Sequence, residues 1–159
     1  MRKFLYAVGA ILALLVVGAG IGLFVLARNG AALDAESKAY VDDSVVTITA
    51  HWSADELLKR STPNLRQITR PDDVQGLFDA ANTALGPLVD YGGSKGDSMV
   101  SAMVGSGTTI SAKYVAHAKF QKGDADLQLT LLKIDGSWKI EGFHINSNAL
   151  MSSLTGRRS

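Results

Sequence analysis

The pattern of apolar and polar positions divides the chain into three parts. Residues 4–27 carry no charge and almost no polar side chain. Over about 34–86, apolar residues recur at intervals of three and four, which is typical of amphipathic helices. Over about 88–147 the interval falls to two, which is typical of strands with one apolar face. Helices followed by strands predict an α+β domain rather than alternating βαβ units.

Three helices are predicted in the first half, each with apolar residues on one face. The first covers about residues 37–50. Ser53 and the glutamate three residues later form a capping box, in which both side chains satisfy free N–H groups at a helix start. A short second helix therefore begins there, and the Thr-Pro pair at 62–63 offers a further start. The long third helix begins at Pro71 and ends at the Gly-Pro pair at 86–87.

The second half predicts an antiparallel meander of four or five strands. Residues 110–120 alternate between apolar and polar side chains, and residues 127–131 do so again. Asp135-Gly136 is the strongest hairpin signal, because a two-residue type I′ turn needs positive φ at both positions. Two weaker strands, at 88–91 and 98–104, are predicted on either side of a glycine-rich loop.

The Asp-Gly turn determines which residues of the last two strands face each other. It places Leu131 opposite Ile140 and, without any irregularity, Leu129 opposite Gly142. Past this point the apolar positions of the last strand change to the other face. Either Gly142 marks a bulge that switches faces, or the sheet is apolar on both sides.

We favour a sheet that is apolar on both sides, because two apolar residues of each of the last two strands then share the outer face. Such a face needs a cover, which a partner subunit, the membrane surface or the chain's own termini would supply. A homodimer and a complex with another envelope protein are the candidate assemblies. The candidate interface residues are Leu132, Ile134, Phe143 and Ile145.

The segment from Leu127 to Ile145, with its Asp-Gly turn, Trp138-Lys-Ile and Gly-Phe, resembles the final hairpin of the nuclear-transport-factor-2-like (cystatin-like) superfamily. The His51-Trp52-Ser53 stretch is similar to that of small bacterial secreted or membrane-anchored proteins of this kind. The resemblance covers about residues 37–148. It implies a cone-shaped sheet wrapped on helices, a pocket at the open end and dimers through the sheet. Members include isomerases, dehydratases and non-enzymatic modules, so the fold does not choose a function.

Large aromatic residues at patterned positions either pack the core or line a cavity for an apolar small molecule. His144 joins them because, without a bulge, it shares the inner face with Trp138. Asp90 beside Tyr91 is the acid–aromatic pair nearest to the expected pocket mouth, and a loop pair without catalytic role is the favoured interpretation. The candidate pocket-lining residues are Trp52, Tyr91, Tyr114, Trp138 and His144.

Residues 4–27 would form a helix of about 36 Å, enough to cross a hydrocarbon core of about 30 Å. The apolar run is longer than in a secretory signal peptide, although Gly-Ala-Ala at 30–32 keeps a cleaved signal as the alternative. Basic residues before the run favour a cytoplasmic N-terminus, with the domain outside a bacterial inner membrane. Gly18 and Gly22 form a GxxxG pair, at which two membrane helices can pack closely. Because glycine is common in membrane helices in any case, a pair without a packing role is the favoured interpretation.

The predicted organisation has five parts. They are a basic cytoplasmic N-terminus over 1–3, a single-pass anchor over 4–27, a linker over 28–36, the α+β domain over 37–148 and a polar tail over 149–159.

Composition excludes several kinds of function. The net charge is +1, but residues 30–154 hold 11 lysines and arginines against 15 aspartates and glutamates. This acidic balance, without a basic stripe, argues against a nucleic-acid partner. Cysteine is absent, which excludes disulfides and thiolate chemistry. The histidines lack metal-ligand spacing, and no GxSxG or phosphate-loop motif occurs, so neither a metal nor a cofactor is predicted.

The favoured interpretation is a membrane-anchored, extracytoplasmic binding or interaction module without catalytic activity. It would bind a partner protein or an apolar small molecule through the sheet or the pocket mouth. One alternative is an isomerase or hydratase that uses a pocket acid with a raised pKa. Another is a scaffold subunit of an envelope complex.

Overall fold

The computed structural model describes residues 30–103 and 107–155. The chain divides into two compact units, residues 1–33 and 34–159, and the second holds the sheet and the helices around it. Among the described residues, no helix combines the length and the apolar character needed to cross a membrane. The predicted anchor at 4–27, with Gly18 and Gly22, lies outside the described residues.

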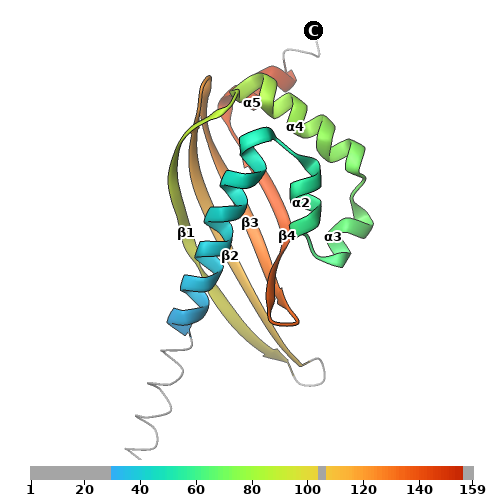
Figure 1. Cartoon of the computed structure of the whole chain (residues 1–159), viewed down its shortest axis with the longest axis vertical. Helices are drawn as coiled ribbons and strands as arrows, with labels where there is room; N and C mark the ends of the chain where they lie inside the picture. Colours follow the sequence, from blue (N-terminus) through green and yellow to red (C-terminus); the bar gives the residue numbers. More distant parts are fainter. Residues whose placement is uncertain (1–29, 104–106, 156–159) are drawn as a thin grey trace, which may run out of the picture. The chain divides into compact units, whose positions relative to one another are not determined.

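Helices occupy one side of the sheet (Figure 1). The first described helix covers residues 30–51, which is longer at both ends than the predicted 37–50. The others are α2 (Ala54–Arg60), α3 (Pro63–Ile68), α4 (Pro71–Leu85) and α5 (Asn148–Thr155).

The capping signals in the sequence mark true helix starts. The Ser53 side chain accepts the Glu56 N–H at the start of α2, and Thr62 accepts the Leu65 N–H at the start of α3. Gly86, with positive φ, ends α4 as predicted. Helix α5 was not predicted, since this segment was expected to be a polar tail. It forms because Leu150 gains a buried position.

The sheet is a four-stranded antiparallel meander in the order β1-β2-β3-β4. The strands are β1 (Leu88–Met103), β2 (Gly107–Phe120), β3 (Gly123–Ile134) and β4 (Ser137–Asn146). The α+β class is confirmed. Asp135 and Gly136 both have positive φ, as the predicted turn requires.

The two weak strands predicted at 88–91 and 98–104 are parts of one strand, and the glycine-rich segment between them belongs to the sheet. Its pairing with β2 is irregular between Tyr91 and Ser94 and regular afterwards. At Gly96, a Cβ would lie 1.9 Å from the Lys113 carbonyl oxygen. Glycine at position 96 therefore allows the two backbones to approach, and the glycine-rich segment is part of the strand rather than a loop.

The core lies between the helices and the inner face of the sheet. The predicted alternation is confirmed for β2 and β3, whose inward side chains are buried from Ala112 to Phe120 and from Ala125 to Leu131. Trp52 packs against Phe78 and Phe120, with ring centroids 5.7 and 5.2 Å apart.

The favoured interpretation of the last hairpin is wrong, because β4 contains a bulge. Leu131 faces Ile140 as predicted, but Thr130 faces Gly142 and Leu129 faces Phe143. Glu141 is the extra residue, so the side chains after it face the opposite side of the sheet from the side that the predicted register gives them.

The bulge changes which residues of β4 face the core. The Phe143 ring lies 5.8 Å from that of Phe78 on the inner face, and Ile145 faces Leu127. Neither residue shares the outer face with Leu132 and Ile134, so the apolar outer face expected from these four residues does not form. His144, expected inside, is exposed and faces Gln128 on the outer face.

Candidate functional site

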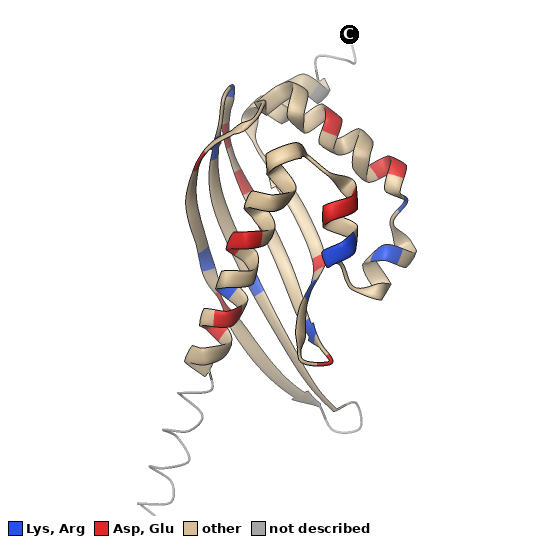
Figure 2. Cartoon of the chain, in the orientation of Figure 1, with Lys and Arg blue, Asp and Glu red and all other residues tan. Residues whose placement is uncertain are grey.

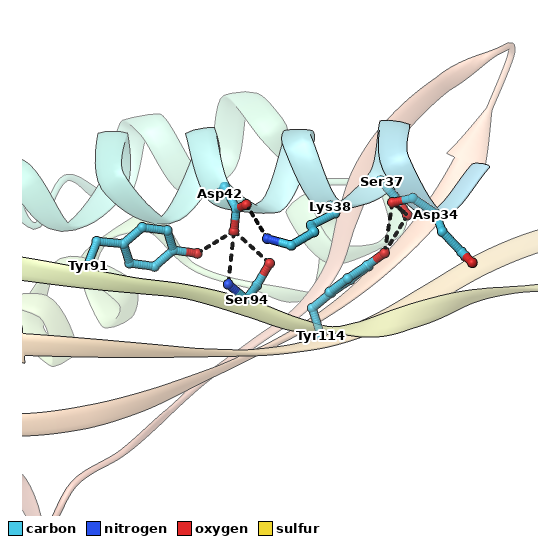
Figure 3. Close-up of polar contacts among 7 residues, drawn as sticks. All are labelled: Asp34, Ser37, Lys38, Asp42, Tyr91, Ser94 and Tyr114. Carbon is cyan, nitrogen blue, oxygen red and sulfur yellow. Dashed lines mark hydrogen bonds and ion pairs between the residues drawn. The ribbon is translucent and has the colours of Figure 1, made fainter. Parts of the chain in front are cut away.

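Acidic residues recur along the first described helix (Figure 2). Three of them bond to the sheet: Glu36 accepts Lys133 Nζ of β3 at 2.5 Å, and Asp34 and Asp42 contact β1. Asp42 Oδ1 accepts hydrogen bonds from the Tyr91 hydroxyl at 2.6 Å and from the Ser94 hydroxyl and N–H at 2.6 and 3.1 Å. Its other oxygen accepts Lys38 Nζ at 2.6 Å (Figure 3). Both carboxylate oxygens are thus occupied by donors of the same chain.

Asp34 makes the second contact of this kind. Its carboxylate accepts the Ser98 N–H at 2.7 Å and the Ser98 hydroxyl. Beside it, the Tyr114 and Ser37 hydroxyls lie 2.9 Å apart, and Tyr114 also donates to the Asp34 carbonyl oxygen at 3.1 Å. We call these two acid–serine contacts, Asp34–Ser98 and Asp42–Ser94, the two clamps.

The two clamps can form together because the distance between the two acids along the helix matches the distance between the two serines along the strand. Eight residues of helix advance about 12 Å, and four residues of strand advance about 13 Å. The helix must run antiparallel to β1 for this match, since Asp34 meets Ser98 and Asp42 meets Ser94. Each clamp also occupies a backbone N–H of β1, an edge strand with no neighbour beyond it.

Hydrogen bonds lower the pKa values of both clamp acids, Asp34 and Asp42, and so favour their ionised forms. Burial favours the neutral form of Asp42, but hydrogen bonds from Lys38, Ser94 and Tyr91 outweigh it and hold its pKa below the usual value. The hydrogen bonds from Ser98 lower the pKa of Asp34. Burial, and then the neighbouring Asp42 carboxylate, raise the pKa of the Tyr91 hydroxyl. Tyr91 is therefore a neutral donor to an anionic acceptor.

The other edge strand, β4, is contacted at Ile140 by the segment between α2 and α3. The Thr62 N–H donates to the Ile140 carbonyl oxygen at 2.8 Å, in a parallel bridge beside Ser61. The bulge residue Glu141 accepts the Thr62 hydroxyl and, at 2.7 Å, the Asn64 amide. Glu141 thus fastens α3 to the sheet.

The structure does not bring the predicted pocket residues together. Trp52 contacts Phe120 next to the β2–β3 turn and donates to the Gly86 carbonyl oxygen at 3.2 Å. Trp138 is buried after the β3–β4 turn, at the opposite end of the sheet, with Lys133 Nζ 5.4 Å from its ring centre. Tyr91 and Tyr114 serve the clamps, and His144 lies outside. Trp52, Tyr114 and Trp138 therefore fill the interior at separate places rather than line a common cavity.

A shallow, open depression of about 270 Å³ lies elsewhere, beside the start of α5. His117 lies there between two carboxylates, with Nδ1 2.8 Å from Asp126 and Nε2 4.0 Å from Asp124. Each ring nitrogen of His117 thus faces an acid. Within the described part of the chain, no cluster of His, Asp and Glu is placed to hold a metal ion.

Sequence reasoning missed the clamps. It paired Tyr91 with its neighbour Asp90, whereas the partner in space is Asp42. A signal was present: Asp34, Lys38 and Asp42 recur every four residues, which places them in one stripe along the helix. Such a stripe next to the apolar face indicates acids at the border of the core.

No protein-family model matches the chain, and no curated protein matches it. The resemblance to the nuclear-transport-factor-2-like superfamily therefore stays a prediction.

Proposed function

We propose that the chain is a membrane-anchored, extracytoplasmic interaction module that has no catalytic site of its own. The proposal rests on the hydrogen bonds that the acidic residues of the first helix make with β1. Asp42 has both carboxylate oxygens occupied, by Tyr91 and Ser94 of β1 and by Lys38. Asp34 has one oxygen occupied by Ser98 of β1, so both acids hold the helix against the sheet.

The same acids argue against the isomerase or hydratase alternative. A carboxyl group that protonates or deprotonates an apolar substrate needs an unshared oxygen and a pKa raised towards neutrality. Hydrogen bonds lower the pKa values of Asp34 and Asp42 instead. Filling of the interior by Trp52, Tyr114 and Trp138 also argues against an apolar ligand inside the sheet.

The outer face of the sheet is the surface we assign to a protein partner. None of the described helices covers it in Figure 1, and alternate residues of β2 present Lys113, Val115, His117 and Lys119 to solvent. Mixed charged and apolar side chains suit a reversible interface better than a permanent one. The partner is either a second copy or another envelope protein, as a scaffold subunit would require.

The anchor is proposed from the sequence of residues 4–27, and a membrane wash tests it. Full-length protein should stay with membranes after a carbonate wash, because an apolar helix of this length leaves the bilayer only at high cost. A processed, soluble form that begins near Leu33 would instead identify a cleaved signal peptide.

Photo-crosslinking in cells tests the outer face. A photoreactive residue at Val115, 44% exposed in the middle of the outer face, should give an adduct of defined mass. The same residue at Val46, 41% exposed on the first helix, is the matched control and should give none. An adduct twice the chain's mass identifies a second copy, and another mass identifies a different protein. Equal adducts from both positions, or none from Val115, would contradict the assignment.

A further inference from the structure

The far end of the β1–β2 hairpin is apolar and exposed. Met99 is 62% exposed and Val100 is 55% exposed. From Ser98 to Ala112 the sequence has no charged residue, and Figure 2 shows the described ends of both strands without charge. We call residues 99–102 and 107–110 the hairpin end. Large apolar side chains gathered at one projecting end of a domain indicate a contact surface.

The hairpin end exposes apolar groups on both faces of the sheet. Met99 pairs with Ser111 on the outer face, whereas Val100 pairs with Ile110 on the inner face. A protein that docks against a sheet covers one face. A lipid interface surrounds what enters it, so side chains on both faces can leave water together.

The direction of β1 places the hairpin end at the side where the chain enters the domain. The domain begins at Asp34, which holds Ser98. Since Asp42 holds Ser94, residues beyond Ser98 lie on the side of Asp34 away from Asp42. Six residues separate Asp34 from the end of the proposed anchor at Ala27, so at most about 25 Å of chain joins them.

We infer that the hairpin end enters the interfacial region of the bilayer in which the chain is anchored. This inference rests on the proposed anchor. The neighbouring outer-face pair Asp97 and Lys113 carries charges of opposite sign, so attraction to anionic lipid contributes little. Contact depends on the apolar side chains, and the anchor keeps them at a high effective concentration at the membrane.

A fluorescent probe on a single introduced cysteine tests the inference, because the chain has no cysteine of its own. The full chain carrying Met99→Cys is reconstituted in phosphatidylcholine vesicles that contain nitroxide-labelled lipid. Met151→Cys is the matched control: Met151 is 60% exposed and lies on α5, which follows β4 beside the β2–β3 turn, at the opposite end of β2 from the hairpin end (Figure 1).

We expect the quencher lipid to cause loss of fluorescence at residue 99 and none at residue 151, with the same result when anionic lipid is added. Floating vesicles with no quenching at residue 99, or equal quenching at both, would overturn the inference and leave the anchor intact. Shielding at residue 99 that appears only at high protein density would assign the surface to a second copy and overturn it as well. A chain that does not float with the vesicles would overturn both the anchor and the inference.

Discussion

Asp42 accepts the Ser94 N–H at 3.1 Å, at the point where the pairing of β1 with β2 becomes irregular. An irregular edge strand has backbone N–H groups without a partner in the sheet. The carboxylate supplies that partner from the helix, so one side chain both satisfies the strand and holds the helix against it.

Removing the Asp42 carboxylate should destabilise the fold. Asp42→Ala leaves the Tyr91 hydroxyl and the Ser94 N–H without their acceptor, which should lower the free energy of unfolding by about 2–3 kcal/mol. Asp43→Ala is the matched control, because the Asp43 carboxylate is exposed and meets only Arg60, so we expect less than about 0.5 kcal/mol. Urea unfolding of both variants measures the difference. Equal losses would show that Asp42 does not clamp the helix.

The clamps should also give the fold an acid limit. Asp34 and Asp42 have folded-state pKa values below the ordinary value of 3.8. As the pH falls through 3.8, the unfolded chain therefore binds protons before the folded chain does, and unfolding becomes more favourable. Their contribution to stability is complete above about pH 5 and is lost progressively below about pH 4. Thermal melts across this range should show the loss, and Asp42→Asn should reduce it. A melting temperature that stays constant down to pH 3 would count against ionised clamps.

Adding one methyl group at two different glycines should have opposite effects. Gly96→Ala places a Cβ against the Lys113 carbonyl oxygen, so we expect a loss of at least about 2 kcal/mol as β1 is displaced. Gly76 lies in α4, and a Cβ added there would meet no neighbouring atom within 4 Å. Gly76→Ala should therefore stabilise the fold by about 0.5–1 kcal/mol. Thermal unfolding of the two variants compares them. A stable Gly96→Ala variant would mean that β1 does not approach β2 so closely.

Because of the bulge in β4, Phe143 faces the core and the adjacent His144 faces solvent. Phe143→Ala removes a ring that packs on Phe78, which should cost about 2–3 kcal/mol for a partly buried side chain. His144→Ala removes an exposed side chain and should cost less than about 0.5 kcal/mol. Without the bulge the order would be reversed, so chemical unfolding of the pair decides the register directly.

The sequence predicted those parts of the fold that depend on local signals. Ser53 and Asp135-Gly136 act through atoms within a few residues of themselves, so their positions are visible in the chain. The inward face of β2 was equally clear, because strict alternation has one explanation.

The parts that could not be predicted depend on distant residues. Gly142 offered a bulge as one of two interpretations, but the sequence could not choose it, because the bulge residue Glu141 is held by Thr62 and Asn64, which lie far away in the chain. The continuity of β1 through its glycines depends on the backbone of Lys113, and the acceptor for Tyr91 comes from a helix 49 residues earlier in the chain. The prediction of a common pocket was wrong for the same reason. Whether its aromatic residues lie together depends on the packing of distant elements, which the sequence pattern does not show.

The hydrogen bond from the Thr62 N–H to the Ile140 carbonyl oxygen bears on how the domain behaves at high local concentration. Proteins tethered to a membrane meet copies of themselves far more often than proteins free in three dimensions, and bare sheet edges are where such copies would join into fibrils. In this fold the segment between α2 and α3 bonds to the edge strand β4 at Ile140. On the edge strand β1, the carboxylates of Asp34 and Asp42 accept the N–H groups of Ser98 and Ser94. Each edge strand is thus interrupted at these positions, which disfavours continuous strand pairing with another copy.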